Sequence, residues 1–254
     1  MQRKILFGVI GVVVVFAIGA TVLYLLASRT SSASADDALV EFRATAGEGR
    51  GDLPGLPPQG VYRYSVEGSE SIGGGPLSVT RDLPETSPRI LRHTDDGYET
   101  EWRISSDHTE YWRYVLDDRG ASTAEERSKL TVAGISGTTE NEWSPPPLRL
   151  PLDPEIGDRW TSEAATPDGQ TVRIESVVAG EDTIDVGGTP VTVTNVESTL
   201  EFGGDLTGEI RETNSYDATT GMEVRHVSES ELTEGGSTVA TRWDATLQSL
   251  EPAR

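Results

Sequence analysis

Apolar and polar residues alternate with a period of two from Gly60 onward, and this alternation limits the possible folds more than any other feature. Tyr62, Tyr64 and Val66 alternate with polar neighbours. The same pattern recurs at Tyr98, Trp102 and Ile104. A period of two is typical of half-buried strands, whereas an amphipathic helix repeats every 3.6 residues. We therefore expect residues 60–254 to form one all-β domain.

Short turn sequences separate the alternating segments. They include Gly73-Gly74-Gly75, Asp95-Asp96-Gly97, Pro167-Asp168-Gly169, Gly187-Gly188 and Gly235-Gly236. Turns this close together favour hairpins and hence antiparallel pairing. About twelve strands are too many for a flat open sheet. The prediction is a strongly curved antiparallel sheet, a half-barrel or an open barrel, in which only Thr123–Leu130 offers a short helix.

A proline-rich seam, residues 144–154, interrupts the alternation. It contains Pro145, Pro146, Pro147, Pro151 and Pro154. Proline fixes its own φ and has no N–H to donate to a β-ladder, so it favours extended chain outside a central strand. We expect the seam to divide the β domain into two halves.

An unbroken apolar run from Ile5 to Ala27 follows Arg3 and Lys4. Its length, at about 1.5 Å per helical residue, is enough to cross a bilayer core of about 30 Å. We expect residues 1–35 to form a cytoplasmic stub, one transmembrane helix and its flank, with the C-terminal domain outside. The small residues that end at Ala35 are an alternative signal-peptidase site, and cleavage there would give a secreted protein.

Residues 36–59 form a predicted acidic tether that is rich in Gly and Pro. Such a composition favours a flexible linker that holds the following domain clear of a membrane surface. Asp36 is placed to cap a short helix through Ala38 and Phe42. One or two turns of helix without a packing partner are marginal in water, so we expect the segment to be mainly a flexible coil.

Charge separates sharply along the chain. All 42 Asp and Glu residues lie at or after Asp36, and the chain has no cysteine. An acidic surface repels phosphate backbones and anionic headgroups, which argues against nucleic-acid binding and favours a soluble, monomeric domain. The lack of cysteine excludes disulfides and thiol catalysis, so packing must stabilise the fold.

The order of several short motifs resembles two groups of proteins. The motifs are Gly60-Val61-Tyr62-Arg63-Tyr64, Gly157 with Trp160, Val186-Gly187-Gly188, Tyr216-Asp217 with Gly221, and the segment from Leu247 to Pro252. They resemble uncharacterised membrane-anchored actinobacterial proteins and the LolA-like half-barrels, which include bacterial lipoprotein carriers. The resemblance implies a curved sheet around an apolar hollow, used by the carriers for acyl chains. This chain differs from the carriers in its membrane-spanning run, because the carriers are soluble or lipid-anchored.

Enzyme motifs are lacking. His93, His108 and His226 are the only histidines, and their spacing fits no metal-ligand pattern. We expect them in turns or on the surface. No Gly-x-Ser-x-Gly elbow occurs. The sequence therefore predicts a protein that is not an enzyme and has neither a metal nor another cofactor.

A set of aromatic residues remains as the candidate site: Tyr62, Tyr64, Trp102, Trp112 and Tyr114. On neighbouring strands these rings would share one face of the sheet, where they either line a cavity or fill the core. Two hypotheses follow. One is a binding domain that accepts a lipid-like or apolar ligand in the hollow. The other is an interaction or structural domain of the envelope with a filled core and another envelope protein as its partner.

Overall fold

The computed structural model describes residues 30–45, 55–73, 78–132 and 135–254. The predicted membrane run at residues 5–27 lies outside these ranges. Among the described residues, no helix has the length and apolar character that a membrane span requires.

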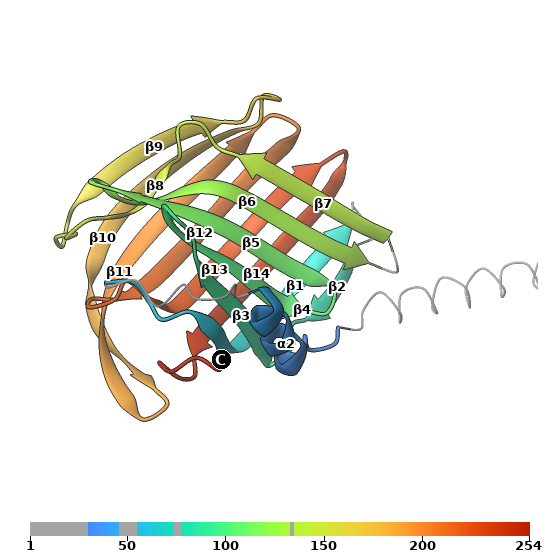
Figure 1. Cartoon of the computed structure of the whole chain (residues 1–254). Coiled ribbons are helices and arrows are strands. Elements are labelled where there is room, and N and C mark those ends of the chain that lie inside the picture. Colours follow the sequence, from blue (N-terminus) through green and yellow to red (C-terminus); the bar gives the residue numbers. More distant parts are fainter. Residues whose placement is uncertain (1–29, 46–54, 74–77, 133–134) are drawn as a thin grey trace, which may run out of the picture.

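Fourteen strands form one antiparallel sheet (Figure 1). They are β1 (Gly60–Gly73), β2 (Val79–Asp82), β3 (Thr86–His93), β4 (Gly97–Ser105), β5 (His108–Asp117), β6 (Gly120–Val132), β7 (Ile135–Glu142), β8 (Leu148–Pro151), β9 (Arg159–Ala165), β10 (Thr171–Val186), β11 (Thr189–Gly203), β12 (Leu206–Asp217), β13 (Glu223–Glu234) and β14 (Ser237–Leu247). Their order is β7-β6-β5-β4-β3-β1-β14-β13-β12-β11-β10-β9, with β2 on β1 and β8 on β6. Thr123–Leu130, expected as a short helix, lies within β6, so that expectation was wrong.

The sheet curls until its two end strands almost meet. Ser144, just beyond β7, forms a β-bridge with Ala165 at the end of β9. Their backbone groups exchange hydrogen bonds of 2.9 and 3.3 Å. The result is a nearly closed antiparallel barrel, and this confirms the all-β, strongly curved fold.

The proline-rich seam lies at the closure. Its strand β8 pairs with β6 through Gly120↔Pro151. Gly120 has φ of 132°, and a Cβ there would lie 2.1 Å from the carbonyl oxygen of Leu150, so only glycine allows β8 to approach this closely. Both halves of the chain belong to one continuous sheet, because β1 pairs with both β3 and β14.

A helix within the predicted tether packs against the outside of the barrel. Helix α2 (Ala35–Thr45) buries Ala38 and Phe42 against Val61 and Ile90. Its first turn is capped by Ser34, whose Oγ accepts a hydrogen bond from the Asp37 amide at 3.0 Å. The expectation of a marginal helix capped by Asp36 was therefore wrong, because the outward-facing Val61 and Ile90 supply the missing partner.

The barrel has two distinct ends. At the proximal end, the amide of Ser106, in the β4–β5 turn, donates to the carbonyl of Ser31 at 2.9 Å. The distal end carries the β3–β4 and β5–β6 turns and the C-terminal segment, which pairs with β1 through Val61↔Ala253. The chain thus enters at one end of the barrel, and α2 leads it to the other (Figure 1).

The barrel interior holds two apolar clusters. One includes Tyr64, Trp102 and Trp243 and lies toward the distal end, and the other includes Trp143, Ile174 and Phe202. Between them runs a row of inward polar side chains that pair across the strands. These are Ser176, Ser198, Glu212 and Ser228. The core is therefore interrupted by polar groups.

Candidate binding site

A buried arginine lies at the centre of the aromatic cluster. Arg89 is 4% exposed, forms an ion pair with Glu223, and donates to Thr100 Oγ1 at 3.3 Å. Its guanidinium carbon lies 5.1 to 5.9 Å from the ring centres of Tyr64, Trp102 and Trp112. Cation–π attraction of this kind strengthens when water is excluded.

Electrostatics fix the charge state of this ion pair. Burial alone would raise the pKa of Glu223, but Arg89 and His226 outweigh it and lower the pKa to about 2. Burial would lower the pKa of Arg89, and Glu223 instead raises it. Both groups are charged at neutral pH. The Nε of Arg89 has no hydrogen-bond partner in the described structure.

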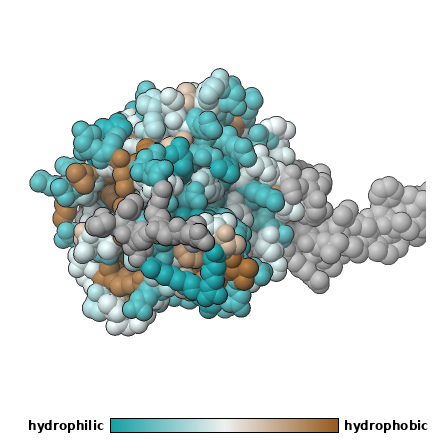
Figure 2. Space-filling model, viewed as in Figure 1, coloured by the Kyte–Doolittle hydropathy of each residue, from teal (hydrophilic) through white to brown (hydrophobic). Residues whose placement is uncertain are grey.

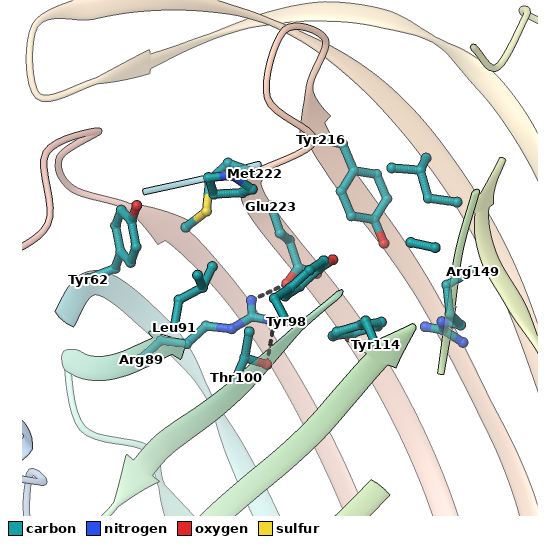
Figure 3. A pocket seen from close by; sticks show the side chains of 14 residues that line it. Tyr62, Arg89, Leu91, Tyr98, Thr100, Tyr114, Arg149, Tyr216, Met222 and Glu223 are labelled. Carbon is teal, nitrogen blue, oxygen red and sulfur yellow. Dashed lines mark hydrogen bonds and ion pairs between the residues drawn. The ribbon is translucent and has the colours of Figure 1, made fainter. Parts of the chain in front are cut away.

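Beside the ion pair, a cavity of about 20 Å³ opens toward the distal end. Residues from opposite walls line it, among them Arg89, Tyr98, Tyr114, Arg149, Tyr216 and Met222. A volume of this size holds about one water molecule. Figure 3 shows the rings of Tyr98, Tyr114 and Tyr216 gathered around this space, with Arg149 beyond them.

Four tyrosines line the cavity, and the hydroxyls of Tyr98, Tyr114 and Tyr216 differ from those of Tyr62 and Tyr64. The hydroxyl of Tyr62 donates to the Pro58 carbonyl at 2.5 Å, and that of Tyr64 donates to the Glu223 carbonyl at 2.6 Å. Those of Tyr98, Tyr114 and Tyr216 have no hydrogen-bond partner among the described residues. Burial raises the pKa of Tyr98 to about 12, so its hydroxyl is neutral at physiological pH and free to donate.

A second polar group continues the cavity wall. Arg149 forms an ion pair with Glu212, and Asn214 Nδ2 donates to the same carboxylate at 2.9 Å. Burial and the nearby Glu110 raise the pKa of Glu126 to about 7, although Arg149 acts in the opposite direction. The Oδ1 of Asn214 is buried without a partner in the described structure.

All three histidines lie inside the fold, contrary to the expectation of turn or surface positions. His93, His108 and His226 are only 4 to 7% exposed. His108 lies between Glu70 and Glu110, at 2.9 and 2.7 Å. Burial would lower the pKa of His108, but hydrogen bonds to Glu110 and Glu70 raise it to about 9.

The structure divides the five predicted site residues between two environments. Tyr64, Trp102 and Trp112 surround Arg89, with ring centres of Trp102 and Tyr64 5.2 Å apart. Tyr62 and Tyr114 line the cavity instead. Tyr114 stacks on Tyr98 with ring centres 4.8 Å apart.

Sequence reasoning missed the charged members of the site, Arg89, Arg149 and Glu223. One signal was present for Arg89, because it alternates in phase with Leu91 on β3 and pairs with both Tyr62 and Trp102. Its position in the strand therefore indicates an inward side chain, while its chemistry suggests an outward one.

A broader concavity of about 450 Å³ lies on the outer face of β9–β14. Its walls are charged side chains such as Glu175, Arg211, Glu229 and Arg242. Arg211 has 70% of its side chain exposed, so this surface is fully hydrated. Among the described residues, no group of His, Asp and Glu side chains has an arrangement suited to holding a metal ion.

Comparison with known proteins assigns the chain to no family. No family model matches the sequence, and no curated protein matches it. Among solved structures, the chain is similar to the crystal structure of the hypothetical lipoprotein YmcC from Escherichia coli, at 15% identity and a TM-score of 0.36, over 84% of this chain and 97% of that one. So loose a likeness does not indicate what this chain binds.

The fold alone defines the class of protein, an all-β barrel. The chain carries an all-β, nearly closed antiparallel barrel, which is consistent with the LolA-like resemblance. Membership of an actinobacterial family stays a prediction.

Proposed function

We propose that this chain is a non-catalytic binding domain of the cell envelope, whose barrel holds the polar end of an amphipathic, lipid-like ligand. The observation that carries the proposal is a set of three tyrosine hydroxyls around one cavity, beside Arg149, that have no hydrogen-bond partner within the described ranges. The three tyrosines are half-buried. Polar groups inside a protein normally have partners, so half-buried hydroxyls that face a cavity without one suggest a ligand or water there. Neutral hydroxyls and an arginine suit a carboxylate or another oxygen-rich head group.

The apolar part of such a ligand would lie against the aromatic walls. Trp112 is only partly buried, and Tyr98 and Tyr114 present a stacked pair at the cavity. A ligand larger than water must displace side chains, because the cavity measures about 20 Å³. Met222, which lines it, is the adaptable wall, since an unbranched thioether chain repacks at low cost.

A second candidate function is an interaction or structural domain with a filled core. The small cavity favours it, as does the near-complete burial of Tyr64 and Trp102 at 0 and 1% exposure. In that case the cavity holds water alone, and the tyrosine hydroxyls bind that water.

We propose that the barrel lies outside the cell membrane, held by residues 5–27, with secretion after cleavage at Ala35 as the alternative. Hydropathy supports an anchor, because the run reaches spanning length. The cavity faces the distal end, away from Thr30, the first described residue. A membrane at the proximal end would therefore leave the cavity accessible.

Hydroxyl deletions test the binding function without disturbing the core. Tyr98→Phe, Tyr114→Phe and Tyr216→Phe remove hydroxyls that have no hydrogen-bond partner in the part of the chain that the structure describes, so stability should hold. Loss of one hydrogen bond of about 0.5 to 1.5 kcal/mol should weaken binding of a fluorescent fatty acid by about 2- to 10-fold per substitution. Titration of residues 30–254 with cis-parinaric acid measures this.

The matched control is Tyr64→Phe, which deletes a hydroxyl bound to Glu223. It should cost stability and leave affinity nearly unchanged. Wild-type protein without saturable binding, or equal affinities in all four variants, would favour the filled-core function instead.

A further inference from the structure

Exposed apolar side chains gather at the distal end of the barrel. Four large ones are exposed among the described residues, and three of these lie at the distal end: Leu116, near the end of β5, and Leu152 and Ile156, in the loop after β8, at 37, 64 and 64%. We call these three residues the distal rim. Single exposed apolar residues are ordinary, whereas several at one end of a molecule are a candidate interaction surface.

The backbone holds the distal rim in place. The amide of Leu152 donates to the Arg119 carbonyl at 2.8 Å, and that of Leu116 donates to the Asp96 carbonyl at 2.8 Å. These bonds join three neighbouring turns. Beyond Leu152, Asp153 is the one described non-glycine residue with a positive φ, at 51°.

The loop that carries Ile156 is fixed at its far side too. The Gly157 amide donates to the Val178 carbonyl at 2.9 Å, and Asp158 accepts from the Glu155 amide at 2.9 Å. Leu152 and Ile156 are thus presented in a fixed conformation, which lowers the entropy cost of binding a partner.

Carboxylates surround the distal rim. Seven exposed acidic residues lie on the same turns: Asp95, Asp96, Asp117, Asp118, Asp153, Glu155 and Asp158. Arg113 and Arg119, on the β5–β6 hairpin, pair with Asp96 and Asp117. The surface is therefore apolar at its centre and negative around it.

We infer that the distal rim is a docking surface for a partner protein with an apolar contact patch ringed by basic residues. The negative charge around the distal rim favours a partner of this kind. A second copy of the chain would bring its own carboxylates against these, and an anionic lipid surface would be repelled likewise. The rim also lies at the opposite end from Thr30, so an anchor at residues 5–27 would direct it away from the anchoring membrane. The inference does not depend on ligand binding inside the barrel.

Site-specific photocrosslinking of the full-length protein in its host tests this. p-Benzoylphenylalanine in place of Leu152 or Ile156 should give one discrete protein adduct. The same probe in place of Thr207, exposed at the proximal end, should not give it. The captured protein is then purified, and its affinity for the full-length chain in detergent is measured.

The combined variant Leu152→Ser/Ile156→Ser should weaken that binding by about tenfold or more, while its thermal midpoint stays that of the wild type. Asp118→Asn with Glu155→Gln should weaken it too, and so should salt near 0.5 M. The inference would be overturned if the probe gave no adduct, or gave adducts only with lipid or with a second copy. It would also be overturned if the affinity of the captured protein were the same with and without these changes.

Discussion

At the scale of single residues, the buried Arg89 explains why a core with so many rings is not simply apolar. The guanidinium occupies space between Tyr64, Trp102 and Trp112, and Glu223 neutralises it. A charge in such a place is tolerated only with a partner, because transfer from water costs several kcal/mol.

Removal of the Glu223 charge should therefore destabilise the protein. Glu223→Gln leaves Arg89 buried without a counter-charge and should lower the free energy of unfolding by about 3 to 5 kcal/mol, as measured by urea denaturation. Asp244→Asn is the matched control, because its pair with Arg225 is about 40% exposed on both sides. That change should cost at most about 1 kcal/mol. Equal losses in the two variants would contradict this explanation.

Glu126 gives the stability a pH dependence that can be isolated. Its folded pKa of about 7 lies above the ordinary value of 4.5. Its contribution to stability is therefore fully present below pH 4.5 and is lost as the pH rises to 7. Glu126→Gln should remove this fall and stabilise the protein by roughly 1 to 3 kcal/mol at pH 8. Unfolding curves at several pH values measure it, and parallel pH profiles of variant and wild type would refute it.

The inward position of the aromatic residues was predictable, whereas that of the charged residues was not. Tyr62, Tyr64, Trp102, Trp112 and Tyr114 follow from alternation together with ring size. Arg89, Glu223 and the histidines did not, because charge and polarity in a strand ordinarily indicate the solvent face. Their burial depends on partners far away in the sequence, such as the 134 positions between Arg89 and Glu223.

At the scale of elements, the strands were predictable and the closure was not. Alternation identifies a strand without its neighbours, since the period of two is local. The pairing of Ser144 with Ala165 depends on how far the whole sheet curls. Helix α2 was underestimated for a similar reason, because its partners Val61 and Ile90 sit on the outward face of strands whose inward face also looks apolar.

Docking of α2 can be tested with a pair of substitutions on opposite faces of the helix. Phe42→Ala removes the buried ring and should cost about 2 to 4 kcal/mol. It should also speed amide hydrogen exchange across Ala35–Thr45. Val40→Ala, at a position 66% exposed, should change neither quantity. Fast exchange in the wild-type helix would show that α2 is not docked.

At the scale of the whole molecule, the acidic surface and the docked helix together define the stable unit. Residues 30–254 should be monomeric by analytical ultracentrifugation, because like charge suppresses association. Residues 60–254 alone expose Val61 and Ile90, which α2 covers at 3 and 0% exposure. That shorter form should bind the dye ANS and associate at high salt. Identical behaviour of the two forms would contradict a structural role for α2.

Native mass spectrometry of residues 30–254, exported and purified from the host without detergent, shows whether the barrel holds a ligand. We expect a fraction of the protein to carry one added mass of lipid size. We also expect this fraction to fall in the combined variant Tyr98→Phe/Tyr114→Phe/Tyr216→Phe and to persist in Tyr64→Phe. A wild-type spectrum that shows only the unliganded mass, even after incubation with excess cis-parinaric acid, would contradict the claim that the barrel binds a ligand.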